Sequence, residues 1–211
     1  MTVLCEAMSF FICYKGAGVD RWLVPKGSPD GVSVSPNGNV VVAVRDSGHL
    51  IVFSPTGQVV KEIKLPAELA SPRHAYQLME NDQFLLCYGW GNSAYGIHVV
   101  DGDGHIIKSS SSSSSSSSAA AATAAIPAGS SPRPESFTPT HLALDHRGNV
   151  LVAEFAGSTV QLYNKRLDYV ADVVLQSSGL KQPFRLCLDE TADRLYIGEY
   201  SGGGRVLVFG K

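Results

Sequence analysis

The sequence has little of several features that would settle its class at once. Its 211 residues include four cysteines, and no two of them form a C-x-x-C pair, which excludes a zinc finger or RING-type metal site in this chain. Charged residues are 17% of the chain and the formal net charge is −2, which excludes a uniformly basic nucleic-acid binder but not a local basic patch. No run of 18 apolar residues occurs, so no membrane span is predicted.

The cysteines and the N-terminus carry few functional signals. Cys87 and Cys187 lie in strand-like runs, and we expect both to be small buried thiols. Residues 1–19 match no recognised pattern. They lack the basic region and the unbroken apolar stretch of a secretory signal, because Glu6 interrupts them. We therefore expect a cytoplasmic protein, with 1–19 left unassigned.

The chain repeats itself. Four similar segments begin at Pro29, Pro72, Pro139 and Pro183, at intervals of 43, 67 and 44 residues. The longer middle interval contains residues 109–136, with ten consecutive serines followed by an alanine-rich stretch. Such a tract cannot bury enough apolar surface to offset its ordering entropy, so a disordered insertion is predicted there.

Each repeat alternates short apolar runs with turns rich in Gly, Asn, Asp and Pro, which is typical of four antiparallel strands. Four-stranded units of about 43 residues indicate the blades of an all-β propeller. Residues 20–108 would form blades one and two, and 137–211 blades three and four. The fourth repeat stops after its third strand, so a closing strand is expected from the N-terminal segment, either Val19–Val24 or Ser9–Tyr14.

The motifs HRGNVLVAEFAGSTVQLYNK and FRLCLDETADRLYIGEYSGGGRVLVF resemble NHL repeats, in particular the C-terminal blades of invertebrate tripartite-motif-like proteins. The resemblance implies a propeller, usually of six blades, that binds protein or single-stranded RNA. It also implies that this propeller is the recognition part of a ubiquitin-ligase-related protein. The RING and B-boxes of that family are not in this sequence, so ligase chemistry is not assigned to it.

The loops after the second strands and the starts of the first strands share one face of a propeller, and loops on a rigid scaffold often carry function. They combine aromatic, arginine and histidine side chains, which suit a protein hot spot or stacked bases. The candidates are Arg45, His49, Arg73, His74, Tyr88, Trp90, His141, Phe155, Arg185 and Tyr200. We expect a non-enzymatic module without cofactor, metal or membrane contact, which binds a protein, or alternatively RNA. The open faces of the outer blades could also lead to self-association.

The alternative is a metal-dependent propeller enzyme. His74 and His141 share a repeat position, as in an amidating-lyase-like site, but zinc usually has three protein ligands. Glu154 and Glu199 share another, as in a gluconolactonase-like site, although we expect them to cap loops. The segment Asp101–His105 lacks the remaining ligands of a calcium loop and is predicted to be a hairpin turn.

Overall fold

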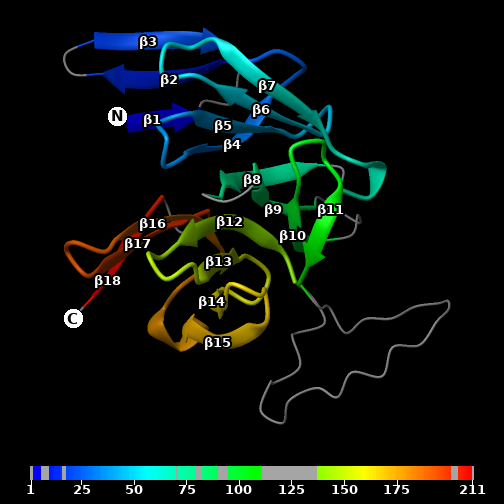
Figure 1. Ribbon diagram of the computed structural model, residues 1–211. Coiled ribbons are helices and arrows are strands. Elements are labelled where there is room, and N and C mark those ends of the chain that lie inside the picture. Colours follow the sequence, from blue (N-terminus) through cyan, green and yellow to red (C-terminus); the bar gives the residue numbers. More distant parts are fainter. Residues whose placement is uncertain are drawn as a thin grey trace, which may run out of the picture. The chain divides into compact units, whose positions relative to one another are not determined.

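The protein is almost entirely β-structure (Figure 1). The computed structural model describes residues 2–5, 10–15, 18–69, 71–78, 82–89, 95–110, 137–200 and 204–210, with side chains from Trp22 onward. The predicted insertion, apart from residues 109 and 110, and the candidate contact residue Trp90 lie outside these ranges. Within them, helix is limited to the short 3₁₀ turns η1 (Ala67–Leu69) and η2 (Gln176–Ser178), and neither has the length to cross a membrane.

The described strands form antiparallel sheets in which chain neighbours are also sheet neighbours. Three sheets have four strands each. The first contains β4 (Pro29–Val34), β5 (Val40–Val44), β6 (His49–Phe53) and β7 (Val59–Lys64), and the second contains β8 (Pro72–Gln77), β9 (Phe84–Tyr88), β10 (Gly96–Val100) and β11 (Ile106–Ser109). The third contains β12 (Pro139–Leu144), β13 (Val150–Glu154), β14 (Thr159–Tyr163) and β15 (Tyr169–Val174). Two have three strands: β1 (Thr2–Cys5), β2 (Phe10–Lys15) and β3 (Gly18–Leu23); and β16 (Pro183–Asp189), β17 (Arg194–Glu199) and β18 (Val206–Gly210).

The four repeats are thus four blade-like sheets, as the proline spacing predicts. The last repeat ends after three described strands, as expected from sequence. The hypothesis that Val19–Val24 or Ser9–Tyr14 closes that sheet finds no support in the described pairing. Strands β2 and β3 pair with each other from Phe10↔Leu23 to Lys15↔Gly18 and form a sheet with β1.

The chain divides into two compact units, residues 1–109 with 139–142, and residues 110–138 with 143–211. In the first unit, the sheets of β4–β7 and β8–β11 lie side by side (Figure 1). Their apolar faces meet in a core that includes Val41, Leu50, Ile63, Phe84 and Leu86. Strands β5 and β9 are buried along their whole length, whereas the outer strand β11 is exposed. Strands β5 and β9 are therefore covered on both faces, which explains why their sequences are apolar at nearly every position.

The second unit has its own core, formed by side chains of β13, β14, β16 and β17 such as Ala153, Val160, Leu186 and Ile197. The prediction that both strand cysteines are buried is half right. Cys87 is buried in β9, but Cys187 is exposed on β16. Its neighbour Leu186 points into the core, and successive residues of a strand face opposite sides.

A β-bulge recurs at the start of the repeats. In β4, β8 and β16 the register with the next strand shifts between the opening proline and the second residue after it: Pro29/Gly31, Pro72/His74 and Pro183/Arg185. A bulge inserts one extra residue and turns the neighbouring side chains in new directions. The directions of two side chains in each of these three repeats therefore depend on a feature that simple alternation does not predict.

Candidate functional site

Two histidines of the first unit meet on strands that each begin a sheet. His74 on β8 and His141 on β12 have ring centroids 3.7 Å apart and an interplanar angle of 27°, so they stack. His74 is 1% exposed and His141 is half-buried. The Nε2 atom of His74 lies 3.2 Å from the carbonyl oxygen of Val32. A carbonyl oxygen only accepts hydrogen bonds, so Nε2 carries the hydrogen and Nδ1 is the basic nitrogen of the neutral ring.

The equivalent residue of the first repeat is Gly31, and its lack of a side chain makes room for His74. A Cβ on Gly31 would overlap the carbonyl oxygen of Arg73 and lie 2.8 Å from the Cα and 2.9 Å from the Cδ2 of His74. Strands β4 and β8 therefore approach too closely for any other residue. Ser33 adds to this contact, because its hydroxyl donates to the carbonyl oxygen of Ala75 at 2.6 Å.

Arg73, expected on the ligand face, is instead inside the protein. Its side chain is 3% exposed and its Nε lies 3.2 Å from Asp30 Oδ2, whose side chain is 12% exposed. Both are the extra residues of their bulges, in β8 and β4. The bulges turn them towards each other, which yields a buried ion pair between two blades. The predicted role of Arg73 as a displayed ligand contact is not consistent with this burial.

Arg45 and His49 lie beside a hollow of about 560 Å³ in the first unit. Arg45 lines it and its Nε is 3.5 Å from Asp46 Oδ1. His49 is half-buried, with Nδ1 2.8 Å from the carbonyl oxygen of Ser47. Lys64, the register partner of His49, also lines the hollow. The sequence predicts Arg45 as a ligand contact, but no sequence signal predicts that Lys64 lies beside it.

Tyr88, another predicted contact, is only 7% exposed and packs against His98 of β10, with ring centroids 5.1 Å apart. The Tyr88 hydroxyl lies 3.3 Å from His98 Nε2, and Ser109 Oγ is 2.7 Å from His98 Nδ1. Burial raises the pKa of Tyr88 and lowers that of His98. Both groups are therefore held neutral around pH 7, and the pair is a polar element of the blade interior rather than a displayed surface.

The remaining candidates form an aromatic cluster in the second unit. Tyr200 is 67% exposed, and its ring centroid lies 5.7 Å from that of Phe155 and 5.3 Å from that of Phe184. The guanidinium carbon of Arg185 lies 4.1 Å from the centroid of the Phe184 ring, which is a cation–π contact. The structure thus brings Phe155, Arg185 and Tyr200 together through Phe184, which the sequence analysis did not single out.

Glu154 and Glu199 cap loops, as expected from sequence. The carboxylate of Glu154 accepts hydrogen bonds from the backbone N–H groups of Thr138 (2.8 Å), Ala156 (3.1 Å) and Gly157 (2.5 Å). Glu199 accepts from Lys181 N at 2.6 Å, and its other oxygen lies 2.9 Å from Arg205 Nε. Their oxygens are occupied by protein donors, so these carboxylates do not fit a gluconolactonase-like metal site.

Replacing Glu154 with alanine should lower the free energy of unfolding by about 2 kcal/mol, because three partly buried N–H groups lose their acceptor. Burial raises the pKa of Glu154, and the backbone hydrogen bonds offset this only in part. Ionisation thus costs the folded state more than the unfolded state, so the stabilisation by Glu154 is greatest below pH 4.5 and falls as the pH rises through the folded pKa. Urea unfolding followed by circular dichroism should show that Glu154→Ala lowers the free energy of unfolding more at pH 4.5 than at pH 7.5. A larger loss at pH 7.5 would contradict the raised pKa of Glu154.

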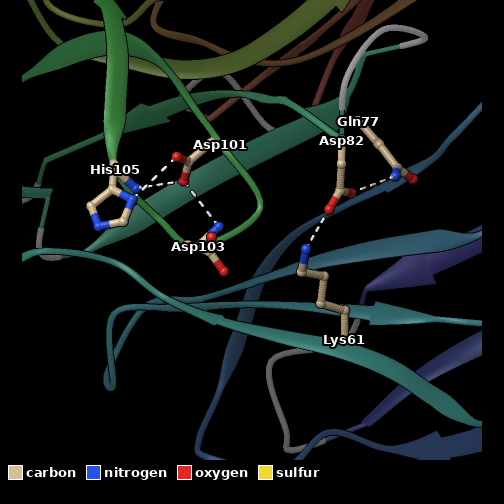
Figure 2. A network of polar contacts seen from close by, with 6 residues as sticks. All are labelled: Lys61, Gln77, Asp82, Asp101, Asp103 and His105. Atoms are coloured by element: carbon tan, nitrogen blue, oxygen red, sulfur yellow. Dashed lines mark hydrogen bonds and ion pairs between the residues drawn. The ribbon is translucent and has the colours of Figure 1, made fainter.

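One group of three side chains among the described residues has the spacing of a metal site, namely Asp101, Asp103 and His105 (Figure 2). These residues form the predicted hairpin turn between β10 and β11, and the hydrogen bonds of that turn account for their closeness. Asp101 Oδ1 accepts from the N–H groups of Asp103 and His105, both at 2.9 Å, and Gly104 N donates to Asp101 O at 3.1 Å. These hydrogen bonds lower the pKa of Asp101, the one from His105 N most. Figure 2 also shows that Lys61 and Gln77 hold Asp82 in a separate network.

Comparisons with known proteins support an enzyme-like propeller. Residues 7–72, less than half of the chain, match the family described as SMP-30/gluconolactonase/LRE-like region. Among solved structures, virginiamycin B lyase from Staphylococcus aureus is 12% identical with a TM-score of 0.59, and covers 97% of this chain and 64% of its own. A streptogramin B lyase is 10% identical with a TM-score of 0.58, and the match covers 99% of this chain and 67% of the lyase. The β-propeller domain of Cps50 (Swd1) from Myceliophteria thermophila is 13% identical with a TM-score of 0.57, and the match covers 91% of this chain and 59% of that domain. No curated protein matches the chain.

The chain has a β-propeller fold. At these identities the structural likeness establishes the fold alone, and the chain spans about two thirds of the length of the lyases. The expectation of a non-enzymatic module is nevertheless corrected, because both the family match and the lyases point to enzyme-like propellers. The finer resemblance to tripartite-motif proteins stays a prediction.

Proposed function

We propose that this chain belongs to a propeller enzyme of the lactonase or lyase kind, in which His141 moves the proton and His74 positions it. The observation that carries the proposal is the stacked pair of histidines on β8 and β12, whose ring centroids are 3.7 Å apart. It is supported by the lyase neighbours, one of which is described as a catalytically inactive histidine-to-alanine variant of the Staphylococcus aureus virginiamycin B lyase with quinupristin.

Both reaction types need a group that takes a proton and returns it. In a lactonase the base takes a proton from water, the water oxygen adds to the ester carbon, and the proton goes to the ring oxygen as the ring C–O bond breaks. In a lyase the base takes a proton from carbon and the neighbouring C–O bond breaks by elimination. Imidazole suits either task near neutral pH. Half-buried His141 can meet a substrate, whereas His74, 1% exposed, acts through the stack.

The described residues do not fit the metal-dependent form of this chemistry. Glu154 and Glu199 are occupied by N–H donors, and the cluster at Asp101 belongs to a hairpin turn. Two histidines are fewer than the three protein ligands of a catalytic zinc site. We therefore route no step of the proposed reaction through a metal.

The test is ring opening of gluconolactone and of quinupristin by the full chain. His141→Ala should lower kcat/KM by about 100-fold or more, the usual contribution of general acid–base catalysis. His74→Ala should lower kcat and shift the pH profile, and His74→Phe, which keeps a stacking ring, should recover part of the loss. His146→Ala is the matched control, because His146 is exposed and contacts Glu190. Equal rates for the wild type and His141→Ala would overturn the proposal.

Ligand binding by the aromatic cluster is a second proposal, since Tyr200 is 67% exposed next to a cation–π pair. Exposed aromatic and arginine side chains of this kind are typical of protein hot spots. Tyr200→Ala should weaken binding of a protein ligand, whereas a single-stranded RNA ligand would also show a strong salt dependence. Val206→Ala, at a similarly exposed position in the same unit, is the control.

A further inference from the structure

The hollow beside Arg45 has the size and lining of a ligand site. Its volume of about 560 Å³ falls within the 300–1,000 Å³ range typical of small-molecule pockets. The walls are the turn at 45–48 between β5 and β6 and residues 64–67, which comprise the last residue of β7 and the three that follow it, with Ser71 before β8. A hydrogen bond from Leu65 N to Gly48 O, 2.9 Å long, joins the two walls. The hollow is thus framed by backbone that the sheet holds in place.

The charged side chains that line the hollow favour an anion. Arg45 and Lys64 each bring a positive charge, and Asp46 brings one negative charge. Ser28 N donates to Asp46 Oδ2 at 3.3 Å and Arg45 Nε lies 3.5 Å from Oδ1, so both oxygens of Asp46 face protein donors. The acidic neighbour Glu68 is not part of the lining. The charged side chains among the described lining residues therefore sum to +1.

The uncharged part of the lining adds hydroxyl groups and an apolar floor. Ser47 and Ser71 contribute hydroxyls, and Leu65, Pro66 and Ala67 contribute apolar surface. A bare inorganic ion would fill little of this volume, because such an ion is only a few times larger than a water molecule, which occupies about 30 Å³ in the liquid. A small organic molecule with hydroxyl groups and one anionic end matches the lining better.

The hollow also lies near the histidine pair along the chain. Ser71 lines the hollow and precedes β8, in which His74 is the third residue. Three residues of a strand span about 10 Å. One edge of the hollow therefore lies at the start of the strand that carries His74, the stacked partner of His141.

We propose that this hollow binds a small hydroxylated organic anion, with its anionic group between Arg45 and Lys64. If the proposed function is right, on which this extension rests, the anion is the non-reacting end of the substrate that His141 acts on. The binding itself is measurable without turnover, so the two proposals can fail separately.

The experiment is calorimetric titration of the full chain with glycerol, glycerate and glycerol 3-phosphate, which share one carbon skeleton and carry no charge, a carboxylate and a phosphate, respectively. We expect saturable binding of glycerate or glycerol 3-phosphate and none of glycerol, and the tighter of the two acids identifies a carboxylate or a phosphate as the preferred group. Arg45→Gln and Lys64→Gln should each weaken binding about tenfold, the usual effect of losing a charge-assisted hydrogen bond. Asp46→Asn should tighten it about threefold, because a like charge is removed.

Two controls keep the result specific. Lys61→Gln removes the same charge from the same strand, β7, but Lys61 pairs with Asp82 and does not line the hollow, so binding should stay within about twofold. His141→Ala should still bind the anion, and if it binds but the wild type turns over no substrate, only the proposed function fails. The inference is overturned if neither acid binds, if glycerol binds equally well, or if Lys61→Gln weakens binding as much as Lys64→Gln.

Discussion

Arg73→Ala is expected to lower the free energy of unfolding by about 4 kcal/mol, because removal of one partner of a buried ion pair leaves the other charge uncompensated. The Asp30 side chain is only 12% exposed, so little water can replace the lost guanidinium. The contact joins β4 to β8, and its loss should loosen the packing between the first two blades. Trp22 packs against Phe53 in the first unit and residues 143–211 contain no tryptophan, so tryptophan fluorescence during urea unfolding does not report on the second unit's strands.

A surface ion pair of the same unit supplies the control. Glu62 lies 3.4 Å from Lys26 and both side chains are more than a third exposed, so Glu62→Ala should cost less than about 1 kcal/mol. The double variant Asp30→Leu with Arg73→Met should recover much of the loss, since an apolar pair of similar volume often replaces a buried ion pair without penalty. A cost for Arg73→Ala as small as that for Glu62→Ala would contradict the burial of this pair.

Gly31→Ala is expected to cost about 3 kcal/mol, at the upper end of the range for overpacking a core. The new methyl group would overlap the Arg73 carbonyl oxygen and lie 2.8 Å from His74 Cα, and backbone atoms cannot move aside as a flexible side chain does. The substitution should also disturb the histidine pair. We therefore expect it to reduce any activity that depends on His141.

Gly198→Ala is the matched control for this variant. Gly198 also lies in a strand, but a Cβ there would meet Arg185 Cβ at an ordinary 3.5 Å. Its effect should stay within about 0.5 kcal/mol, because space is available and alanine lowers the entropy of the unfolded chain. Far-UV circular dichroism follows the unfolding of both variants, and an equal effect at the two positions would show that β4 and β8 are not in close contact.

The repeat pattern of the sequence predicted the sheets well. The prolines at 29, 72, 139 and 183 each begin a first strand, and the runs between turns become the other strands, because alternation and turn residues are local signals. The shared repeat position of His74 and His141 was also readable, and the structure stacks the two rings. Loop capping by Glu154 could be predicted because its place at a strand end is local as well.

The predictions that failed depended on the direction in which side chains point and on contacts between strands. Arg73 and Tyr88 were expected on a surface, but a bulge turns the first towards Asp30 and a neighbouring strand brings His98 over the second. Lys64 was missed because its closeness to Arg45 arises from the pairing of β6 with β7 and the fold of the turn at 45–48. None of these contacts joins residues that are adjacent in the sequence.

The bulge that opens three of the first strands also bears on how such a protein can change over time. The backbone departs from regular pairing at the same place after Pro29, Pro72 and Pro183, yet the residue that follows the bulge is glycine, histidine and arginine in turn. The same backbone shape therefore carries three different residues, and the neighbouring strand decides which of them fits. At Gly31 the close approach of β8 leaves no room for a side chain, whereas β8 and β16 hold a histidine and an arginine at this position. A change of chemistry here is thus open only to a repeat whose neighbour leaves space for the new side chain.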